Sequence, residues 1–414
     1  MRRTAVVVGS SVAGVRTVRA LRSEGFDGEI VLVGAESELP YDKPPLSKQF
    51  LSGERDASRI SLLTEADAAA LDVQLRLGAR AVHLDVAARR VVLADGSWVP
   101  YDACVVATGA AARPSPWGAR SGVHVVRSLG DSANLREDLL LGGAIVVVGG
   151  GFIGAEVAAT AHRLGGAVTI VDPLPAPLAR VLGPEVGGLF AGLHERHGVA
   201  TRFGTGVTSI EGESGDLEVR LSDGTVLRAA TVVVGIGAVP NDRWLASSGL
   251  LVDDGVVCDE FCRAVDATDV YAVGDVARWW HPGHGEHVRV EHWTNAVDQA
   301  VCVAHNIAHP DDPREYRPVE YVWSDQYDWK IQIVGRPATA TGYQVIGDFG
   351  ADRPRAAAVY TDSTGRLTAA VTVNWPRALV ECRRLVAAED DFDEAVARLD
   401  VLAAVAPRTT GVHS

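Results

Sequence analysis

The chain has 414 residues, of which 47% are apolar and 22% are charged, an ordinary composition that excludes a disordered or fibrous protein. At about 150 residues per domain, this length predicts two or three domains. The 39 basic and 53 acidic residues give a net charge of −14, and 6% of the residues are aromatic. This charge disfavours binding to nucleic acid or to a membrane surface, and the low aromatic content argues against base stacking on single strands.

Five cysteines over this length, with no Cys-x-x-Cys pair, indicate reduced thiols and not a disulfide framework. The apolar run after Thr4 ends at Gly9 without a cleavage site, so we expect no secretory signal. No apolar stretch reaches the ~18 residues that a membrane span needs. We therefore expect a cytoplasmic protein.

The order strand, helix, strand occurs twice, about 140 residues apart, with a glycine cluster after the first strand each time. The strands are runs of β-branched residues typical of a parallel sheet buried on both faces, and the helices are rich in alanine. This is the order of a dinucleotide-binding fold, and it predicts an α/β protein with two Rossmann-like domains. The predicted elements are Thr4–Val8, Val12–Arg22 and Ile30–Val33 in the first copy, and Ile145–Val148, Ile153–Leu164 and Val168–Val171 in the second.

The first glycine loop departs from the G-x-G-x-x-G pattern, because its second glycine is replaced by Ser11. Gly9 supplies the tight turn, Gly14 permits close packing of helix on strand, and the small Ala13 lies between them. Serine is small and its hydroxyl can donate to a phosphate, so we interpret the loop as a variant. Glu36 follows the second strand, where a carboxylate can accept hydrogen bonds from ribose hydroxyls.

The second loop matches the pattern completely with Gly149, Gly151 and Gly154. Asp172 ends the following strand, as a ribose-binding acid should. No Arg or Lys follows Asp172 until Arg180, so no cation is placed to hold a 2′-phosphate. The sequence therefore favours NADH over NADPH.

Further short motifs follow strands elsewhere in the chain. Ala107, Thr108 and Gly109 come after a strand at 103–106, and Gly237 closes a Gly-Ile-Gly turn after a strand at 232–234. Asp275 ends a Tyr-Ala-Val-Gly-Asp segment, where an acid can bind a polyol hydroxyl while nearby amides bind phosphate.

Outside the two nucleotide folds, the pattern predicts hairpins and a separate end domain. Segments 79–99 and 207–227 alternate apolar and polar residues around Asp-Gly turns, which indicates antiparallel hairpins. Beyond about residue 317, strands at 332–334, 356–360 and 367–373 precede a helix at 378–387, which predicts an α+β domain.

Together these segments resemble the FAD-dependent, NADH-linked ferredoxin reductases, the group of putidaredoxin reductase and rhodocoxin reductase within the glutathione-reductase-like superfamily. The resemblance covers the chain from residue 4 to residue 400 and is most specific at 39–48, 149–156 and 323–328. It implies FAD-binding segments at 1–112 and 238–316, an NAD-binding domain at 113–237, and a C-terminal α+β domain at 317–414 that completes the flavin pocket.

The resemblance also implies roles for individual residues. The expected FAD contacts are Gly9, Ala13, Gly14, Glu36, Lys48, Val82, Arg127, Asp275 and Trp293, with Ser11, Lys43, Ala107, Thr108 and Gly109 as further cofactor-binding candidates. The expected NADH contacts are Gly149, Gly151, Ile153, Gly154, Glu156, Asp172, Arg180 and Gly237. The family's acid after the second strand often lies one position earlier, at Ala35 here. Trp323 resembles the aromatic residue beside the stacked nicotinamide and flavin.

Lys48, Glu156 and Trp323 are the predicted catalytic residues. The chain has only three lysines: Lys43 and Lys48 lie in a family-like stretch and Lys330 lies two residues after another, which suggests positions where the larger head of arginine does not substitute. An ammonium at Lys48 would stabilise negative charge that develops on a reduced flavin, and Glu156 is its expected partner. Hydride transfer from NADH needs positioning and a pocket poor in water more than acid–base chemistry.

Several absences narrow the reaction. Residues 36–52 contain no cysteine, so the redox cysteine of disulfide reductases, NADH peroxidases and NADH oxidases is missing, and the flavin must deliver its electrons directly. Three histidines at 281–287 are interpreted as a solvated loop, and Cys258 and Cys262 as core residues, so no metal site is expected.

The leading hypothesis is thus an NADH:ferredoxin reductase that reduces an acidic [2Fe–2S] ferredoxin serving a haem-thiolate monooxygenase or a ring-hydroxylating dioxygenase. The alternatives are a rubredoxin reductase or quinone-like small-molecule reductase, and a flavoprotein that senses NADH. We expect a monomer or weak homodimer. Candidate cations for docking a ferredoxin are Arg278, Arg289, Arg314, Arg317 and Lys330.

Overall fold

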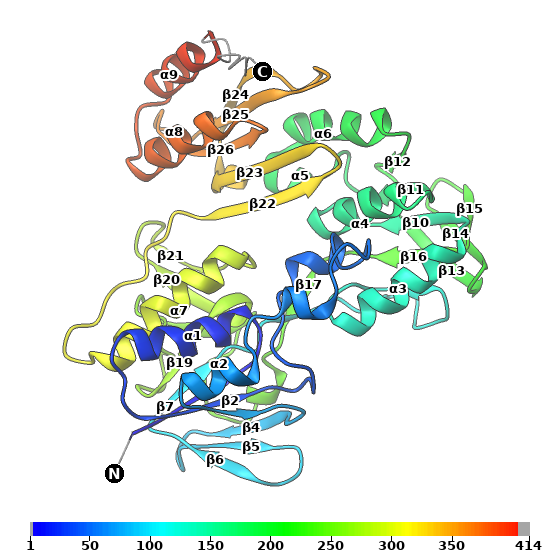
Figure 1. Ribbon diagram of the computed structural model, residues 1–414. Coiled ribbons are helices and arrows are strands. Elements are labelled where there is room, and N and C mark those ends of the chain that lie inside the picture. Colours follow the sequence, from blue (N-terminus) through cyan, green and yellow to red (C-terminus); the bar gives the residue numbers. More distant parts are fainter. Residues whose placement is uncertain (1–2, 405–414) are drawn as a thin grey trace, which may run out of the picture. The chain divides into compact units, whose positions relative to one another are not determined.

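The computed structural model describes residues 3–404, which divide into two compact units (Figure 1). Unit 1 contains residues 3–118, 124–138 and 236–318, and unit 2 contains residues 119–123, 139–235 and 319–404. Within residues 3–404, every helix is too short or too polar to cross a membrane.

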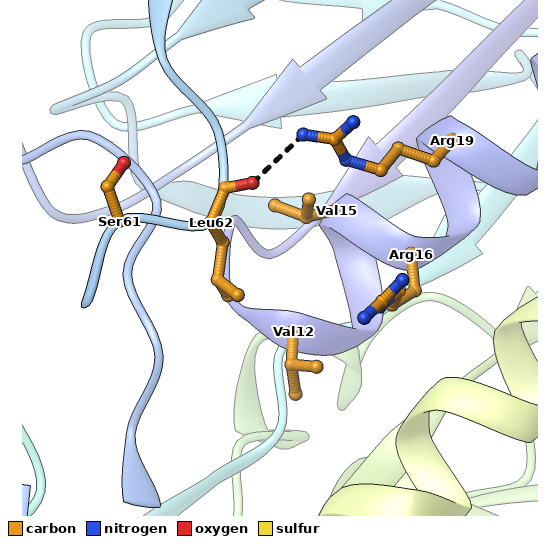
Figure 2. Close-up of a pocket in the computed structure, with 6 residues that line it drawn as sticks. All are labelled: Val12, Val15, Arg16, Arg19, Ser61 and Leu62. Carbon is orange, nitrogen blue, oxygen red and sulfur yellow. Dashed lines mark hydrogen bonds between the residues drawn. The ribbon is translucent and has the colours of Figure 1, made fainter. Parts of the chain in front are cut away.

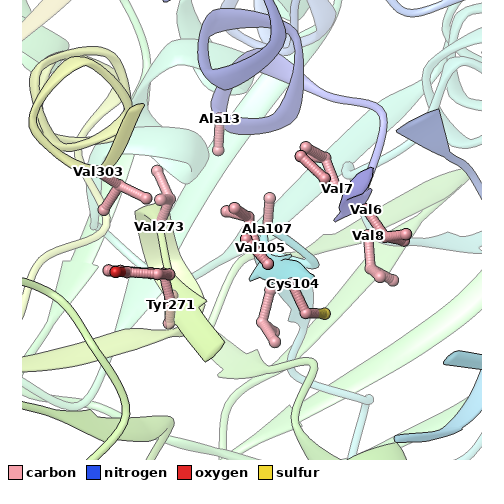
Figure 3. Close-up of a cluster of buried hydrophobic side chains, with 14 of the residues drawn as sticks. Val6, Val7, Val8, Ala13, Cys104, Val105, Ala107, Tyr271, Val273 and Val303 are labelled. Atoms are coloured by element: carbon pink, nitrogen blue, oxygen red, sulfur yellow. The ribbon is translucent and has the colours of Figure 1, made fainter. Parts of the chain in front are cut away.

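Unit 1 is built on a five-stranded parallel sheet with the strand order β19-β7-β1-β2-β3. Its β-branched strands are buried because helices α1 and α7 pack against each other and onto the sheet. Figure 3 shows Ala13 of α1 and Val303 of α7 in the same apolar cluster as Val7, Val105 and Val273. The elements are β1 (Thr4–Val8), β2 (Glu29–Val33), β3 (Val73–Arg76), β7 (Ala103–Val106), β19 (Val270–Ala272), α1 (Val12–Ser23) and α7 (Trp293–Ala308).

Shorter elements of unit 1 surround this sheet. The hairpin segment expected at 79–99 forms the antiparallel sheet β4-β5-β6, and further small sheets pair β8 with β17 and β18-β20-β21. Their bounds are β4 (Ala81–Asp85), β5 (Arg90–Leu93), β6 (Trp98–Pro100), β8 (Ala110–Ala112), β17 (Ala238–Pro240), β18 (Val256–Cys258), β20 (Ala277–His281) and β21 (Glu286–Arg289). The helices and helical turns are α2 (Glu65–Ala70), η1 (Pro44–Ser47), η2 (Ala57–Ile60), η3 (Arg243–Leu245), η4 (Gly274–Val276) and α3 (Leu129–Leu141), which begins in this unit.

Unit 2 contains a second parallel sheet, with the order β12-β11-β10-β16 and β9 at its edge, and a three-stranded antiparallel sheet β13-β14-β15. The bounds are β9 (Val123–His124), β10 (Ala144–Val148), β11 (Ala167–Asp172), β12 (Ala200–Phe203), β16 (Thr231–Val234), β13 (Val207–Glu213), β14 (Asp216–Leu221), β15 (Val226–Ala229), α4 (Phe152–Arg163), α5 (Ala179–Leu182) and α6 (Pro184–Arg196).

The C-terminal part of unit 2 is a five-stranded antiparallel sheet in the order β22-β23-β26-β25-β24, followed by two helices. The bounds are β22 (Tyr321–Gln326), β23 (Trp329–Gly335), η5 (Pro337–Thr339), β24 (Gly342–Asp348), β25 (Arg355–Thr361), β26 (Leu367–Val373), α8 (Pro376–Ala387) and α9 (Phe392–Ala404).

One apolar core joins this C-terminal sheet to the second nucleotide fold. The ring of Phe190 on α6 lies 5.3 Å from the ring of Trp329 on β23, and both belong to one buried cluster. The expected segments 113–237 and 317–414 therefore lie mostly in the same unit, and their division into separate domains stays a prediction.

Candidate functional site

The first glycine loop leaves no room for side chains at two of its positions. Gly9 has φ +122°, and a Cβ there would lie 2.1 Å from the carbonyl oxygen of Ala107. A Cβ on Gly14 would lie 1.8 Å from the carbonyl oxygen of Gly9. Both contacts are with backbone, which does not yield easily, so these positions require glycine. The loop backbone is consequently drawn tightly between β1, β7 and the start of α1.

The replacement of glycine by Ser11 is explained by comparison with Gly151 in the second loop. Both residues precede the first turn of a helix in an extended conformation, with φ −97° and ψ −163° at Ser11 and φ −76° and ψ −175° at Gly151. A Cβ added to Gly151 would meet no atom within 4 Å. The Ser11 side chain does not cap α1, so the loop tolerates serine and its hydroxyl is not used by the helix.

The second loop repeats this geometry and is also tied to the acid that follows it. A Cβ on Gly154 would lie 1.9 Å from the carbonyl oxygen of Gly149. The Asp172 carboxylate accepts the N–H of Gly150 at 2.7 Å and the N–H of Leu174 at 2.8 Å. The predicted ribose-binding acid is therefore fixed directly against the glycine loop.

The first acid is held differently, by side chains of the segment that follows it. Glu36 accepts a short hydrogen bond from the hydroxyl of Tyr41 and lies 3.4 Å from the Lys43 ammonium. Lys43 also donates to the Tyr41 hydroxyl and to the carbonyl oxygen of Arg127, each at 3.3 Å. Burial, followed by the nearby Arg127 charge, lowers the pKa of Lys43. The three hydrogen bonds of the Lys43 ammonium thus all go to protein groups, which they orient.

Asp275 lies in the helical turn η4 between β19 and β20. Among the residues that the structure describes, its carboxylate has one hydrogen-bond donor, the Arg127 guanidinium at 3.2 Å. Burial raises the pKa of Asp275, and the Arg127 charge opposes that shift. Gly274 just before it has φ +77° and lets η4 approach α1, because a Cβ there would lie 3.2 Å from the Cβ of Ala13. A carboxylate so placed can accept a hydrogen bond from a ligand hydroxyl.

Lys48 ends the turn η1 and is half-buried. The nearby Asp42 carboxylate accepts the indole N–H of Trp293 at 2.8 Å. Burial raises the pKa of Asp42, whereas this hydrogen bond and, to a smaller degree, the charges of Arg16 and Lys48 oppose that shift. The Arg16 guanidinium lies over the Trp293 ring, 5.8 Å from its centre. The structure therefore joins the predicted residue Trp293 to Asp42, which sequence reasoning did not select.

Glu156 is 3% exposed on α4, an unusual environment for a carboxylate. It accepts a hydrogen bond from the Ser324 hydroxyl at 2.7 Å, and the Gln326 amide donates to the same hydroxyl at 3.2 Å. Trp323 is the neighbour of Ser324 on β22, and its ring lies nearly parallel to that of Tyr321, with centres 6.4 Å apart. Within unit 2, the predicted residue Glu156 is thus tied to strand β22 at the neighbour of Trp323.

The remaining predicted residues divide between the two units. In unit 1, Thr108 exchanges hydrogen bonds with Asn241, at 2.8 and 2.9 Å. Gly237 also lies in unit 1, and its carbonyl oxygen accepts the N–H of Arg113 at 2.9 Å. In unit 2, Gly235 lies beside the second glycine loop, since a Cβ there would lie 3.4 Å from the Gly154 nitrogen.

Three predicted contacts have exposed side chains: Val82 on β4 is 43% exposed, Ile153 is 44% exposed, and Arg180 is exposed on α5. The expected pair of Lys48 with Glu156 joins residues of different units and stays a prediction. Gly109, with φ +64°, lies beside Arg127, since a Cβ there would be 3.3 Å from that guanidinium.

A shallow recess of about 220 Å³ lies along one face of α1 (Figure 2). Val12, Val15, Arg16 and Arg19 line it at helical spacing, and Ser61 and Leu62 close it. Arg19 donates to the carbonyl oxygen of Leu62 at 3.1 Å, whereas Arg16 is exposed. None of these residues was predicted as a site residue, since their spacing is also that of an ordinary amphipathic helix.

Two of the expected docking arginines are already engaged. Arg278 pairs closely with Asp253. Arg289 is mostly buried and pairs with Asp254 at 3.0 Å and Glu291 at 2.7 Å. Paired guanidinium groups attract an acidic partner weakly, so these two residues are poor candidates for a docking surface.

Two glycine-cradled loops, each with an acid after the following strand, define a protein of the class that binds two dinucleotides. The chain belongs to the pyridine nucleotide-disulphide oxidoreductase family, which it matches over residues 3–300, and residues 321–401 match the reductase C-terminal domain. The predicted family, the α/β fold class and the use of a pyridine nucleotide by an oxidoreductase are therefore confirmed.

Individual relatives align over most of the chain. Rhodocoxin reductase of Rhodococcus erythropolis is 38% identical over 387 residues, which are 93% of this chain and 89% of that protein. The ferredoxin–NAD(+) reductase component of the anthranilate 1,2-dioxygenase system of Burkholderia cepacia is 39% identical over 92% of this chain and 94% of its own length. Rubredoxin–NAD(+) reductase of Pseudomonas putida is 37% identical over 80% of this chain and 86% of its own length. The crystal structure of the covalent putidaredoxin reductase–putidaredoxin complex matches with a TM-score of 0.88 and 31% identity, over 96% of this chain and 98% of that one.

Proposed function

We propose that this protein is an FAD-dependent NADH:ferredoxin reductase. It takes electrons from NADH and passes them singly to an acidic [2Fe–2S] ferredoxin that serves a haem-thiolate monooxygenase or a ring-hydroxylating dioxygenase. The observation that carries the proposal is the pair of glycine-cradled loops in a chain with no cysteine at 36–52. Relatives that act on ferredoxins cover nearly the whole chain and support the same activity.

The residues of unit 1 fit FAD. The loop at Gly9 and Gly14 presents backbone N–H groups at the start of α1, which has no acidic residue in its first turn to repel a pyrophosphate. Glu36 is held by Tyr41 where it can accept ribose hydroxyls, and the half-buried Asp275 carboxylate keeps lone pairs for a donor in addition to Arg127. Bound FAD would supply the two-electron acceptor for hydride and the one-electron donor for the partner.

Unit 2 supplies the NADH site in this proposal. The loop from Gly149 to Gly154 takes the pyrophosphate, and Asp172 takes the hydroxyls of the adenosine ribose. The carboxylate oxygens of Asp172 keep lone pairs beyond the two used by Gly150 and Leu174. A 2′-phosphate at this place would face a fixed negative charge, which selects NADH.

Lys48 supplies positive charge where the reduced flavin gains electron density. Its charge opposes the burial that raises the pKa of Asp42, the residue that accepts the Trp293 indole N–H, and this supports the role. A fixed cation stabilises a transition state in which negative charge develops. Glu156 and its partner Ser324 hold the strand that carries Trp323, so their role is to position that aromatic ring.

An exposed arginine is proposed as part of the docking site for an acidic partner. Arg16 is exposed at the α1 recess, beside Trp293, in a chain whose net charge of −14 repels an acidic protein at long range. Attraction must then come from a local site, and Arg16 replaces the paired Arg278 and Arg289 as its first candidate.

Steady-state cytochrome c reduction with NADH and a panel of ferredoxins tests the proposal. Turnover that needs an added [2Fe–2S] ferredoxin supports it. A rubredoxin reductase is the second candidate, favoured by the 37% identical relative, and turnover with rubredoxin alone would select it. Rapid quinone reduction without ferredoxin turnover, or a persistent NADH complex that changes the oligomeric state, would overturn the proposal.

The cytoplasm and a monomer or weak homodimer belong to the same proposal. All five cysteines are free, and burial raises the pKa of Cys104, Cys258 and Cys262, so these thiols are inert. Sedimentation of the FAD-loaded protein with and without NADH measures the oligomeric state.

A further inference from the structure

Three potential metal ligands meet where α1 and α7 end, in unit 1. Glu24 is the C-cap residue of α1, His305 lies in the last turn of α7, and His309 is the C-cap residue of α7. Nδ1 of His305 lies 2.9 Å from Oε2 of Glu24, and Nε2 of His309 lies 3.3 Å from the same oxygen. The potential ligand atoms of the three residues all lie within 4.8 Å of one another. None of these side chains has a role in the proposed electron transfer.

The hydrogen bonding of His305 points one ring nitrogen at Glu24 and the other at a backbone carbonyl. Both ring nitrogens face oxygen acceptors, since Nε2 lies 3.0 Å from the carbonyl oxygen of Asp312 and Nδ1 faces the Glu24 carboxylate. A neutral imidazole carries one N–H. When Nε2–H donates to Asp312, Nδ1 can meet the Glu24 carboxylate favourably in two ways: as the second N–H of an imidazolium, or as a lone pair that shares a metal ion with Glu24.

This arrangement is the one that metal-bound histidines adopt. A histidine that binds a metal through one nitrogen usually donates its other N–H to a carbonyl or carboxylate, which fixes its orientation. His305 is 4% exposed and held in this way by Asp312. The turn that carries Asp312 is itself fixed, because the Asn306 side chain donates to the carbonyl oxygen of Arg314 at 3.0 Å and accepts its N–H at 2.7 Å.

The distances suit a tetrahedral ion. Ligands about 2.0–2.1 Å from zinc lie about 3.3 Å from one another in a tetrahedron, close to the 2.9 and 3.3 Å that separate the Glu24 oxygen from the two imidazole nitrogens. Two imidazoles and one carboxylate favour Zn²⁺ over the oxygen-seeking Mg²⁺ and Ca²⁺. The side chain of His309 is 46% exposed, which leaves the fourth position open to water.

We propose that Glu24, His305 and His309 bind one Zn²⁺ or similar divalent transition-metal ion, which clamps the ends of α1 and α7 together. The two helices already pack against each other, and the opposite end of α1 forms the first glycine loop. The clamp therefore stabilises the unit that carries the proposed FAD site. The positive charge of Arg314, which also acts on Glu24, works against the ion.

The test is a zinc titration of the FAD-loaded, chelator-treated protein against a chromophoric zinc indicator. We expect the wild type to bind one more equivalent than His309→Ala and Glu24→Gln, and Zn²⁺ to raise the thermal midpoint of the wild type but not of these two variants. Both changes are at partly exposed side chains and preserve the buried His305. His83→Ala, a histidine of β4 bonded to Ser247, is the matched control and should bind as the wild type does.

A further variant sharpens the outcome. Arg314→Gln removes the opposing charge and should tighten zinc binding severalfold without changing the stoichiometry. Equal zinc stoichiometry in the wild type, His309→Ala and Glu24→Gln would overturn the proposal and leave His305 as an imidazolium paired with Glu24. A zinc-dependent rise in the thermal midpoint that persists in both variants would overturn it as well.

Discussion

Replacement of Asp172 by alanine should erode the preference for NADH over NADPH. The Asp172 carboxylate ends β11 and accepts backbone N–H groups of Gly150 and Leu174 at 2.7 and 2.8 Å, so it has a single fixed position beside the second loop. In the proposed function, its remaining lone pairs accept the ribose hydroxyls of NADH. The same charge opposes the 2′-phosphate of NADPH.

The magnitude follows from the bonds that are lost. A hydrogen bond to a charged group contributes about 1.5–3 kcal/mol. Losing it lowers kcat/KM for NADH, whereas NADPH loses an electrostatic repulsion instead. We expect the ratio of the two kcat/KM values to narrow by about 1–3 kcal/mol, which is about 5- to 150-fold, since ~1.4 kcal/mol is tenfold.

Ferricyanide reduction at varied NADH and NADPH measures both constants. Asp223→Ala is the control, because Asp223 is an exposed turn carboxylate of the same unit that accepts the N–H of Thr225 at 2.8 Å. Asp172→Asn keeps the size of the side chain and removes its charge. It therefore distinguishes the loss of electrostatic repulsion toward NADPH from a change in the conformation of the glycine loop. An unchanged ratio in folded Asp172→Ala, or an equal fall for both nucleotides, would refute the reasoning and reduce Asp172 to a loop tether.

Three other outcomes are expected. Lys48→Ala should retain FAD but slow its reduction by NADH about 10- to 100-fold in stopped-flow measurements, with the exposed Lys330→Ala unchanged; an unaltered limiting rate would assign Lys48 to the surface. Arg16→Glu should raise the KM for ferredoxin severalfold and weaken its salt dependence, whereas Arg80→Glu, at an exposed arginine of the same unit, should do neither. Burial lowers the pKa of His194 to about 4. The folded state therefore binds fewer protons than the unfolded state between pH 6.5 and 4, and stability falls across that window as pH falls. His194→Gln should reduce the loss of unfolding free energy across this window by about 2–3 kcal/mol, measured by urea denaturation at several pH values. An equally steep loss in the variant would exclude His194 as its source.

The nucleotide folds were predictable because their signals are local. The predicted strand Thr4–Val8 is β1 itself, and the predicted helix Val12–Arg22 ends one residue before α1 does. Strands buried on both faces must be continuous apolar runs, and a loop without room for a Cβ must contain glycine. Both constraints act on residues that are close together in the sequence, so they can be recognised without the structure.

Other elements have weak local signals. Strand β24 was not predicted, and Ile346 is its one buried residue among seven, so it shows no apolar alternation. Helix α6 was not predicted either, because its sequence contains three glycines that disfavour a helix, yet Phe190 and Leu193 bury it against the core. In both cases tertiary packing decides the structure.

The pairs that build the site were not predictable, because their partners lie far apart in the chain. Ser324 is 168 residues from Glu156, and Trp293 is 251 residues from Asp42. The sequence identified Glu156 and Trp293 through family resemblance, but gave no reason to select Ser324 or Asp42. A pattern within one segment does not specify which distant hydroxyl or carboxylate completes it.

The two nucleotide folds have glycine loops of similar geometry, but their acids are oriented by different groups. Asp172 is held by the glycine loop itself, within one strand–helix–strand unit. Glu36 is held by Tyr41 and Lys43, which belong to the segment that continues to Lys48. Residues 36–52, which include that segment, contain no cysteine. The same short stretch therefore orients Glu36, the acid proposed for the FAD ribose, and carries Lys48, the cation proposed to act on the flavin.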